Sequence, residues 1–132
     1  MTSVRELMTP APETIGAEQS IDEANRRMRR AQVRHLPVLS GAQLVGLLSD
    51  RDARLVESVA KGEHVLVGDV MTPEPFVVHT DEDLKDVVAA MAARKLGSAI
   101  VVEAGKVVGI FTTTDALHLL LRHLVLDDVR GF

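Results

Sequence analysis

Two stretches of nine residues decide how the chain folds: residues 45–53 read VGLLSDRDA, and residues 108–116 read VGIFTTTDA. Each joins an apolar run to a hydroxyl residue that an aspartate follows three positions later, which is typical of a strand that leads into a capped helix. The same offset of 63 positions pairs the Met-Thr-Pro of residues 8–10 with that of residues 71–73. Along this offset, residues 4–53 share eleven identities with the second copy, without a gap. The chain is therefore a tandem duplication.

Each copy is predicted to run β-α-β-β-α. A helical turn ends at each Met-Thr-Pro, because proline stops a helix and restricts the residue before it. An extended stretch and an amphipathic helix follow, and the sequence Ser20 to Glu23 has the form of a capping box. Two short apolar strands and a closing helix complete the copy. The expected positions are 13–16, a helix after Ser20, 35–39, 43–48 and a helix from about 50, then 76–79, a helix after Asp83, 98–102, 106–111 and a helix from about 114.

Composition limits the kind of protein. The 132 residues include three phenylalanines and neither Tyr nor Trp, so the core is expected to be aliphatic. The absence of Cys excludes disulfides and thiolate metal sites and fits a reducing compartment. The net charge of −4 disfavours a protein that coats nucleic acid. No apolar run reaches the ~18 residues of a membrane span, and the charged N-terminus does not resemble a signal peptide. We therefore expect a cytoplasmic protein without a membrane segment.

Together these motifs resemble a tandem pair of CBS domains. The resemblance rests on the paired Met-Thr-Pro starts, the strand 36–38 (Leu-Pro-Val), and the Gly-apolar-apolar-Ser/Thr-x-x-Asp endings. It implies an α/β fold in which two β-α-β-β-α repeats pack as one pseudo-two-fold module. The repeats would span residues 1–62 and 63–126, followed by a frayed C-terminal tail at 127–132. In that family two modules commonly associate through their helices into a flat disc, and adenosine-containing ligands bind in the clefts between repeats.

The two strand–helix junctions are the leading candidates for ligand binding. Free backbone N–H groups and the helix dipole at such a junction favour an anion such as phosphate. A carboxylate nearby can accept hydrogen bonds from both hydroxyls of a ribose. The resemblance assigns ribose binding to Asp52 and Asp115, and phosphate contacts to Ser49, Thr112 and Thr113. The alternative is that these side chains act only as helix caps.

An adenine ring would need an apolar slot. Without Tyr or Trp, and with Phe111 as the only aromatic residue near a motif, aliphatic side chains would have to hold the ring. The segments after each Met-Thr-Pro match the part of the family that contacts adenine, and the strands beside them add two candidates. Ordinary core packing is the alternative for each of these residues. The candidates are Thr14, Ile15, Val77, Val78, Pro37 and Ile100.

Basic residues distinguish the two copies. Arg34 and His35 precede the Leu-Pro-Val strand, where nucleotide-binding members of the family carry basic residues that touch phosphates. The second copy has Gly97 and Ser98 at these positions. The two sites are therefore expected to differ in their preference for phosphate, unless the Arg-His pair is simply solvated.

A run of four arginines, at positions 26, 27, 29 and 30, lies opposite the apolar face of the first predicted helix. The run could bind an anionic partner or nucleic acid. No aromatic residues interleave with it, as single-strand binding would require. We therefore favour a solvated face balanced by Asp22 and Glu23.

The last predicted helix is apolar on more than one face. Leu117, Leu120, Leu121 and Leu124 form one stripe, and Leu119 and Leu126 lie off it. A helix with this much apolar surface suggests a buried interface between two copies of the chain.

The function that the sequence favours is a regulatory module that binds AMP, ADP, ATP or S-adenosylmethionine and passes its occupancy to an unknown effector protein by population shift. No required cofactor is expected. No metal-ligand spacing of histidines, P-loop or nucleophile with a base is present in the sequence, so a metal site and an enzyme are not expected. The alternative is a purely structural dimerisation module without bound nucleotide. Nucleic-acid binding through the arginine run is a third and weaker hypothesis.

Overall fold

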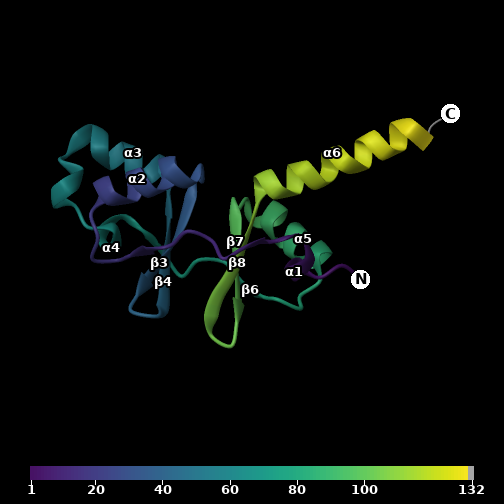
Figure 1. Ribbon diagram of the computed structural model, residues 1–132, viewed down its shortest axis with the longest axis horizontal. Helices are drawn as coiled ribbons and strands as arrows, with labels where there is room; N and C mark the ends of the chain where they lie inside the picture. The colour runs from purple at the N-terminus through teal and green to yellow at the C-terminus, as the bar shows by residue number, and fades with distance from the viewer. Residues whose placement is uncertain (131–132) are drawn as a thin grey trace. The chain divides into compact units, whose positions relative to one another are not determined.

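A computed structural model describes residues 1–130 of the chain (Figure 1). It has the mixed α/β fold that the sequence predicts, with two copies of the β-α-β-β-α order. Each copy begins with the predicted helical turn before Met-Thr-Pro, followed by a two-residue strand at Thr-Pro that the sequence does not predict. The elements are α1 (Val4–Leu7), β1 (Thr9–Pro10), β2 (Ile15–Gly16), α2 (Ile21–Ala31), β3 (His35–Ser40), β4 (Gln43–Ser49), α3 (Asp50–Val59), the 3₁₀ helix η1 (Gly62–His64), α4 (Val67–Val70), β5 (Thr72–Pro73), β6 (Val77–His79), α5 (Leu84–Arg94), β7 (Ser98–Glu103), β8 (Lys106–Thr112) and α6 (Thr113–Arg130).

The chain forms two compact units that do not coincide with the two copies. Unit 1 contains Met1–Pro10, Phe76–Val102 and the chain from Gly109 onward, and unit 2 contains Ala11–Pro75 and Glu103–Val108. The first ten residues therefore fold with the second copy. The repeat boundaries predicted from the sequence concern the duplication rather than these units, and they stay predictions.

The two sheets have the same design. In unit 2 the strand order is β2-β3-β4-β5, with β2 parallel to β3 and the remaining pairs antiparallel. The sheet of unit 1 has the order β1-β8-β7-β6, with β6 parallel to β7 and β1 antiparallel to β8. Each Thr-Pro thus forms an edge strand, where proline's missing N–H costs no ladder hydrogen bond.

Each Met-Thr-Pro packs against the glycine of the strand–helix motif in the other copy, Gly109 or Gly46. Thr9 pairs with Ile110 and the Sδ of Met8 lies against Gly109, while Thr72 and Met71 stand in the same relation to Leu47 and Gly46. A Cβ at Gly46 would lie 2.9 Å from the carbonyl oxygen of Thr72 and would meet the Met71 sulfur. The Met-Thr-Pro of each copy therefore packs against the strand that leads into the strand–helix junction of the other copy.

We expect Gly46→Ala to lower the free energy of unfolding by about 1–3 kcal/mol, the usual cost of an extra methyl group in a packed site. Urea denaturation followed by circular dichroism measures this change. Gly16→Ala is the matched control, because its Cβ meets only the flexible end of the Glu18 side chain. An equal loss in both variants would show that general β-strand effects, and not the methionine contact, set the cost.

Helix α2 packs beside α3 and against β3 in unit 2 (Figure 1). Its buried face carries Ile21, Ala24 and Met28, as the apolar spacing predicts. Ser20 caps the helix, because its Oγ accepts the Glu23 N–H at 3.1 Å. The second half of the predicted capping box does not form, since the Glu23 carboxylate binds arginines of α2 instead.

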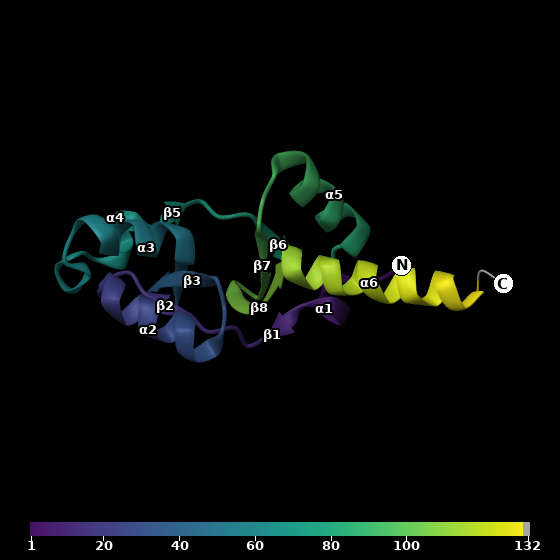
Figure 2. The ribbon, with the colours of Figure 1, turned by 90° about the horizontal axis from the view of Figure 1, so that it is seen from above.

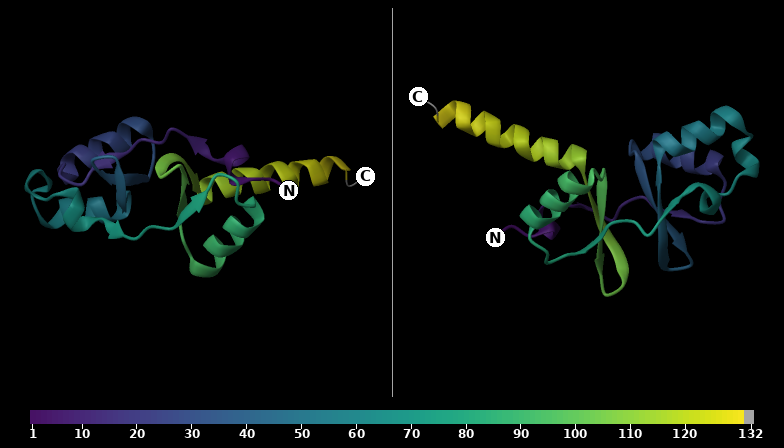
Figure 3. Two further views of the ribbon diagram at one scale, coloured as in Figure 1. Left: turned by 90° about the horizontal axis from the view of Figure 1, so that it is seen from below. Right: turned by 180° about the vertical axis from the view of Figure 1, so that it is seen from behind.

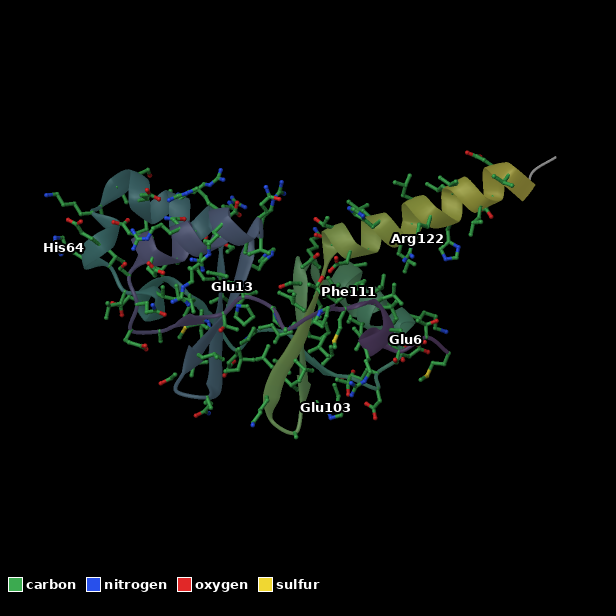
Figure 4. The ribbon with its side chains drawn as sticks, viewed as in Figure 1. Glu6, Glu13, His64, Glu103, Phe111 and Arg122 are labelled. Atoms are coloured by element: carbon green, nitrogen blue, oxygen red, sulfur yellow. The ribbon has the colours of Figure 1, made fainter. Side chains whose placement is uncertain are left out.

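Unit 1 differs from unit 2 in its last helix. Helix α6 continues to Arg130, four residues past the end that the sequence predicts at 126, and in Figures 2 and 3 it extends beyond α5. Of the expected frayed tail, residues 127–130 are helical, and 131–132 lie outside the described residues. Phe111 is fully buried within unit 1 (Figure 4). Among residues 1–130, no helix combines the length and the apolar character that crossing a membrane requires.

Candidate functional site

Strand register gathers the candidate residues of the first copy at one end of the unit 2 sheet. Ile15 is paired with Val38, so Thr14 stands one step before the β2–β3 ladder, beside Pro37. On the other side of β3, His35 faces Ser49, the last residue of β4. This end of the sheet therefore combines the starts of β2 and β3 with the junction between β4 and α3.

The junction itself is a capped helix start. The Ser49 Oγ accepts the Asp52 N–H at 3.2 Å, and the Asp50 N–H donates to the Arg34 carbonyl at 2.8 Å. Asp52 is half-buried, and within residues 1–130 no hydrogen bond reaches its carboxylate. The carboxylate is thus held one turn into α3 with its acceptor positions open.

His35 gives this end of the sheet a group that can change its charge. Burial lowers the pKa of His35 below its ordinary value of 6.5; the nearby Asp50 carboxylate opposes this shift, and Arg34 adds to it. Arg34 itself is exposed. His35 and the exposed Arg34, whose guanidinium makes no hydrogen bond or ion pair within the described residues, therefore lie at the start of β3.

The second copy repeats the arrangement in unit 1. Val77 is paired with Ile100, and Val78 with Val101. The Thr113 N–H donates to the Gly97 carbonyl at 3.0 Å, in the same relation as Asp50 to Arg34 in unit 2.

The aspartate of the second junction is engaged within the protein. Asp115 Oδ2 accepts the Thr112 N–H at 2.9 Å and the Thr112 hydroxyl at 3.0 Å, and the Thr112 Oγ1 accepts the Asp115 N–H at 3.2 Å. This is a complete reciprocal cap of the start of α6. Asp115 therefore acts as a capping residue, whereas no hydrogen bond from the described residues reaches the Asp52 carboxylate. Thr113, which follows Thr112, is exposed.

The candidates for an apolar slot that holds the adenine base fall into a buried group and a solvent-accessible group. Ile15, Pro37, Val78 and Ile100 are buried and take part in core packing. Thr14 is half-buried and Val77 is 41 % exposed, so these two can be reached from solvent.

An aromatic residue near the second site escapes the sequence analysis, which considers only Phe111. Phe76 directly precedes Val77, is half-buried, and lies 5.0 Å below the guanidinium of Arg94. Its position as the first residue of the extended stretch 76–79 was the available signal, since every other candidate there is aliphatic.

The arginine run is largely ion-paired. Arg26 Nη2 lies 2.6 Å from Glu23, and Arg30 Nη2 lies 3.1 Å from Glu13. Arg27 also binds Glu23, and these two hydrogen-bonded guanidinium groups, Arg26 first, lower the pKa of the Glu23 carboxyl. Arg27 is half-buried, so the run is not the uniformly exposed face that the spacing predicts. The pairing favours a charge-balanced helix over a free basic surface.

An apolar groove of about 780 Å³ separates α5 from α6 in unit 1. Met91, Leu96, Leu117 and Leu120 are among the residues that line it. The stripe that the sequence predicts on α6 is exposed, with Leu120 at 51 % and Leu124 at 52 %. Among residues 1–130, no cluster of three or more His, Cys, Asp or Glu side chains could hold a metal ion.

Two copies of one known domain account for most of the chain. The family profile of the CBS domain matches residues 4–57 and 67–122. The chain belongs to the CBS domain family, as a tandem pair.

Relatives of known sequence and structure share this architecture. Inosine-5'-monophosphate dehydrogenase of Korarchaeum cryptofilum is 31 % identical over 118 residues, which are 87 % of this chain but 22 % of the dehydrogenase. CBSX2, a CBS-pair protein from Arabidopsis thaliana that has been solved in complex with AMP, is 30 % identical with a TM-score of 0.77 over 92 % of this chain and 98 % of CBSX2. The CBS domain pair of protein MJ0100, solved with 5'-methylthioadenosine and S-adenosyl-L-methionine, is 26 % identical with a TM-score of 0.82 over 91 % and 96 %.

Proposed function

We propose that this chain is a regulatory module of the cytoplasm that binds adenosine-containing ligands at its strand–helix junctions and works as a homodimer. The observation that carries the proposal is the unit 2 junction, where a free carboxylate at Asp52, the Ser49 cap and the basic pair Arg34 and His35 meet at one end of a sheet. AMP in CBSX2 and the adenosyl ligands in the MJ0100 pair support the choice of ligand.

The two junctions are proposed to bind with different strength. Unit 2 offers the free Asp52 carboxylate for ribose and the exposed Arg34 for phosphate. In unit 1 the Asp115 carboxylate already accepts two hydrogen bonds, and Gly97 supplies no cation. AMP, ADP and ATP are therefore proposed for unit 2, and a ligand with less negative charge, such as S-adenosylmethionine, suits unit 1 better.

The output of the module is proposed to pass to an effector protein through a shift between two arrangements of the protein, which requires only that the ligand bind one arrangement more tightly. The exposed stripe of α6 and the groove beside α5 support a second copy of the chain as the dimer partner. We propose no chemical reaction: the Ser49 Oγ accepts the Asp52 N–H at 3.2 Å, which supports a capping and binding role for this hydroxyl.

A purely structural dimerisation module is the second candidate. It is favoured by one observation, the complete capping of α6 by Thr112 and Asp115, which explains these residues without a ligand. The same explanation does not extend to Asp52.

Thermal unfolding in the presence of single ligands separates the two candidates. Saturation of a site at 100 times the dissociation constant adds about 2.7 kcal/mol to the free energy of unfolding, so a ligand raises the melting temperature visibly. We expect a rise with AMP and with S-adenosylmethionine and none with inosine or GMP. No rise with any adenosine-containing ligand would leave the structural module as the function.

AMP binding to unit 2 is expected to tighten as the pH falls from about 8 to about 6, because a phosphate near His35 stabilises its imidazolium form. Since the pKa of His35 in the free protein is below 6.5, the ring is neutral at neutral pH and binding takes up a proton. Titration calorimetry in two buffers of different ionisation enthalpy measures this uptake. His35→Gln should abolish it, and an uptake that survives in this variant would contradict the assignment.

Protonation of His35 destabilises the folded protein when no ligand is bound. Because the folded-state pKa of His35 lies below the unfolded value, the unfolded chain binds more protons, and His35 lowers the free energy of unfolding as the pH falls below 6.5. AMP should offset this loss.

A further inference from the structure

A difference between the two copies leaves the start of β2 without a ladder hydrogen bond. In unit 1 the Ile100 N–H donates to the Phe76 carbonyl at 2.9 Å and so ties the start of β6 to β7. The residue 63 positions earlier is Pro37, which has no N–H to donate. The segment Glu13–Thr14 therefore lacks the bond that holds its counterpart in the second copy.

Arg27 ties the same segment at the next residue, since the bond that Pro37 cannot make would end on the Glu13 carbonyl and Arg27 binds the Thr14 carbonyl. Its Nη1 donates to the Thr14 carbonyl oxygen at 2.9 Å, and its Nε donates to Glu23 Oε1 at 3.2 Å. Its side chain is 25 % exposed, compared with 62 % for Arg26 and 71 % for Arg30. The second copy has Ala90 at this position, so the arginine is present where the proline is present and absent where the N–H is available.

The guanidinium is itself held in place. Ser20 caps α2 by accepting the Glu23 N–H, and the Glu23 carboxylate then binds Arg27 one turn further along the helix. The planar guanidinium can make both bonds at once because its donors are fixed in a fork. Arg30 adds a second tie to the same segment through Glu13.

We propose that Arg27 is a positioning residue of the unit 2 site: its bond to the Thr14 carbonyl restrains the segment Glu13–Thr14, which lacks the ladder bond from position 37 to the Glu13 carbonyl. The inference rests on the proposed function, because Thr14 is one of the two base-slot candidates that solvent can reach. Arg27 acts through Thr14 and makes no contact with the ligand.

Titration calorimetry with AMP tests the proposal on four chains: the wild type, Arg27→Ala, Arg29→Ala, and the double variant Arg27→Ala with Pro37→Ile. We expect Arg27→Ala to weaken AMP binding at unit 2 by about three- to tenfold. Arg29→Ala removes the same charge from an exposed arginine whose side chain makes no hydrogen bond or ion pair within the described residues, and it should change the affinity by less than about twofold. The double variant recreates the Ile and Ala of the second copy, and its new N–H can tie the same segment through the Glu13 carbonyl, so it should bind AMP more tightly than Arg27→Ala alone.

The outcomes separate the inference from the proposed function. If the wild type does not bind AMP, the proposed function fails and the positioning role fails with it. If the wild type binds and Arg27→Ala binds equally well, or if Arg29→Ala loses as much, only the inference is overturned. A double variant that binds no more tightly than Arg27→Ala, with all four chains folded by circular dichroism, also overturns it, because holding the segment Glu13–Thr14 would then not set the affinity.

Discussion

The double substitution Leu120→Glu and Leu124→Glu is expected to convert the proposed dimer to a monomer of 14.3 kDa in multi-angle light scattering. Both leucines are about half exposed on α6 of the isolated chain, so unit 1 can fold without burying the new carboxylates. In a dimer they would enter an apolar contact, where each unpaired charge costs several kcal/mol. The dissociation constant of the dimer should therefore rise by at least about a hundredfold.

Arg122→Glu is the matched control for this experiment. It changes the net charge by the same two units, and at 100° per residue Arg122 lies opposite the leucine stripe of α6. The control should remain a dimer. A wild-type chain that is monomeric at micromolar concentration, or a double variant that stays dimeric, would contradict a dimer built on this stripe.

Asp52→Ala is expected to weaken AMP binding by about 1.5–3 kcal/mol, the size of hydrogen bonds to a charged group. The free energy of unfolding should hardly change, because the cap of α3 uses the Ser49 hydroxyl and the Asp52 backbone N–H, both of which remain. Asp115→Ala should weaken ligand binding at unit 1 by less, because the Asp115 carboxylate already accepts two hydrogen bonds from Thr112. It should also lower the free energy of unfolding by about 1 kcal/mol, since it removes half of a reciprocal cap.

Titration calorimetry and urea denaturation on the two single variants measure these effects side by side. Asp52→Asn, which keeps the shape of the side chain and loses its charge, should bind AMP with intermediate affinity. Wild-type affinity in the combined Asp52→Ala and Asp115→Ala variant would remove both aspartates from the site.

The fold was predictable because the same pattern of strands and helices is encoded in both copies of the duplicated sequence. The apolar spacing of α2, the Ser20 cap and the strand–helix junction at Ser49 all describe local structure, and the structure confirms them. The offset of 63 residues then strengthens each prediction, since one pattern has to fit two sequences.

Long-range pairing was not predictable from these patterns. Nothing local in Met-Thr-Pro indicates that Met8 packs on Gly109 and Met71 on Gly46, because an edge strand of two residues has no periodicity. The length of α6 was also underestimated, because Asp127 and Asp128 look like the start of a polar tail.

Side-chain partnerships at the candidate site needed the structure as well. The sequence assigns Asp52 and Asp115 the same role, but only Asp115 is engaged in a reciprocal cap. Arg27 looks like one member of a solvated run, and only the structure shows that its guanidinium donates to the Thr14 carbonyl. The hydrogen-bond partner of a long side chain depends on which acceptors the tertiary structure brings within its reach, and local sequence does not indicate this.

A crystal structure of the chain grown with millimolar AMP would show whether the unit 2 junction is the nucleotide site. We expect AMP at this junction, with its ribose hydroxyls donating to the Asp52 carboxylate, its phosphate close to Ser49 and Arg34, and its adenine beside Thr14. AMP that binds elsewhere, or an Asp52 carboxylate without a ligand hydroxyl in a crystal where AMP is bound, would contradict it.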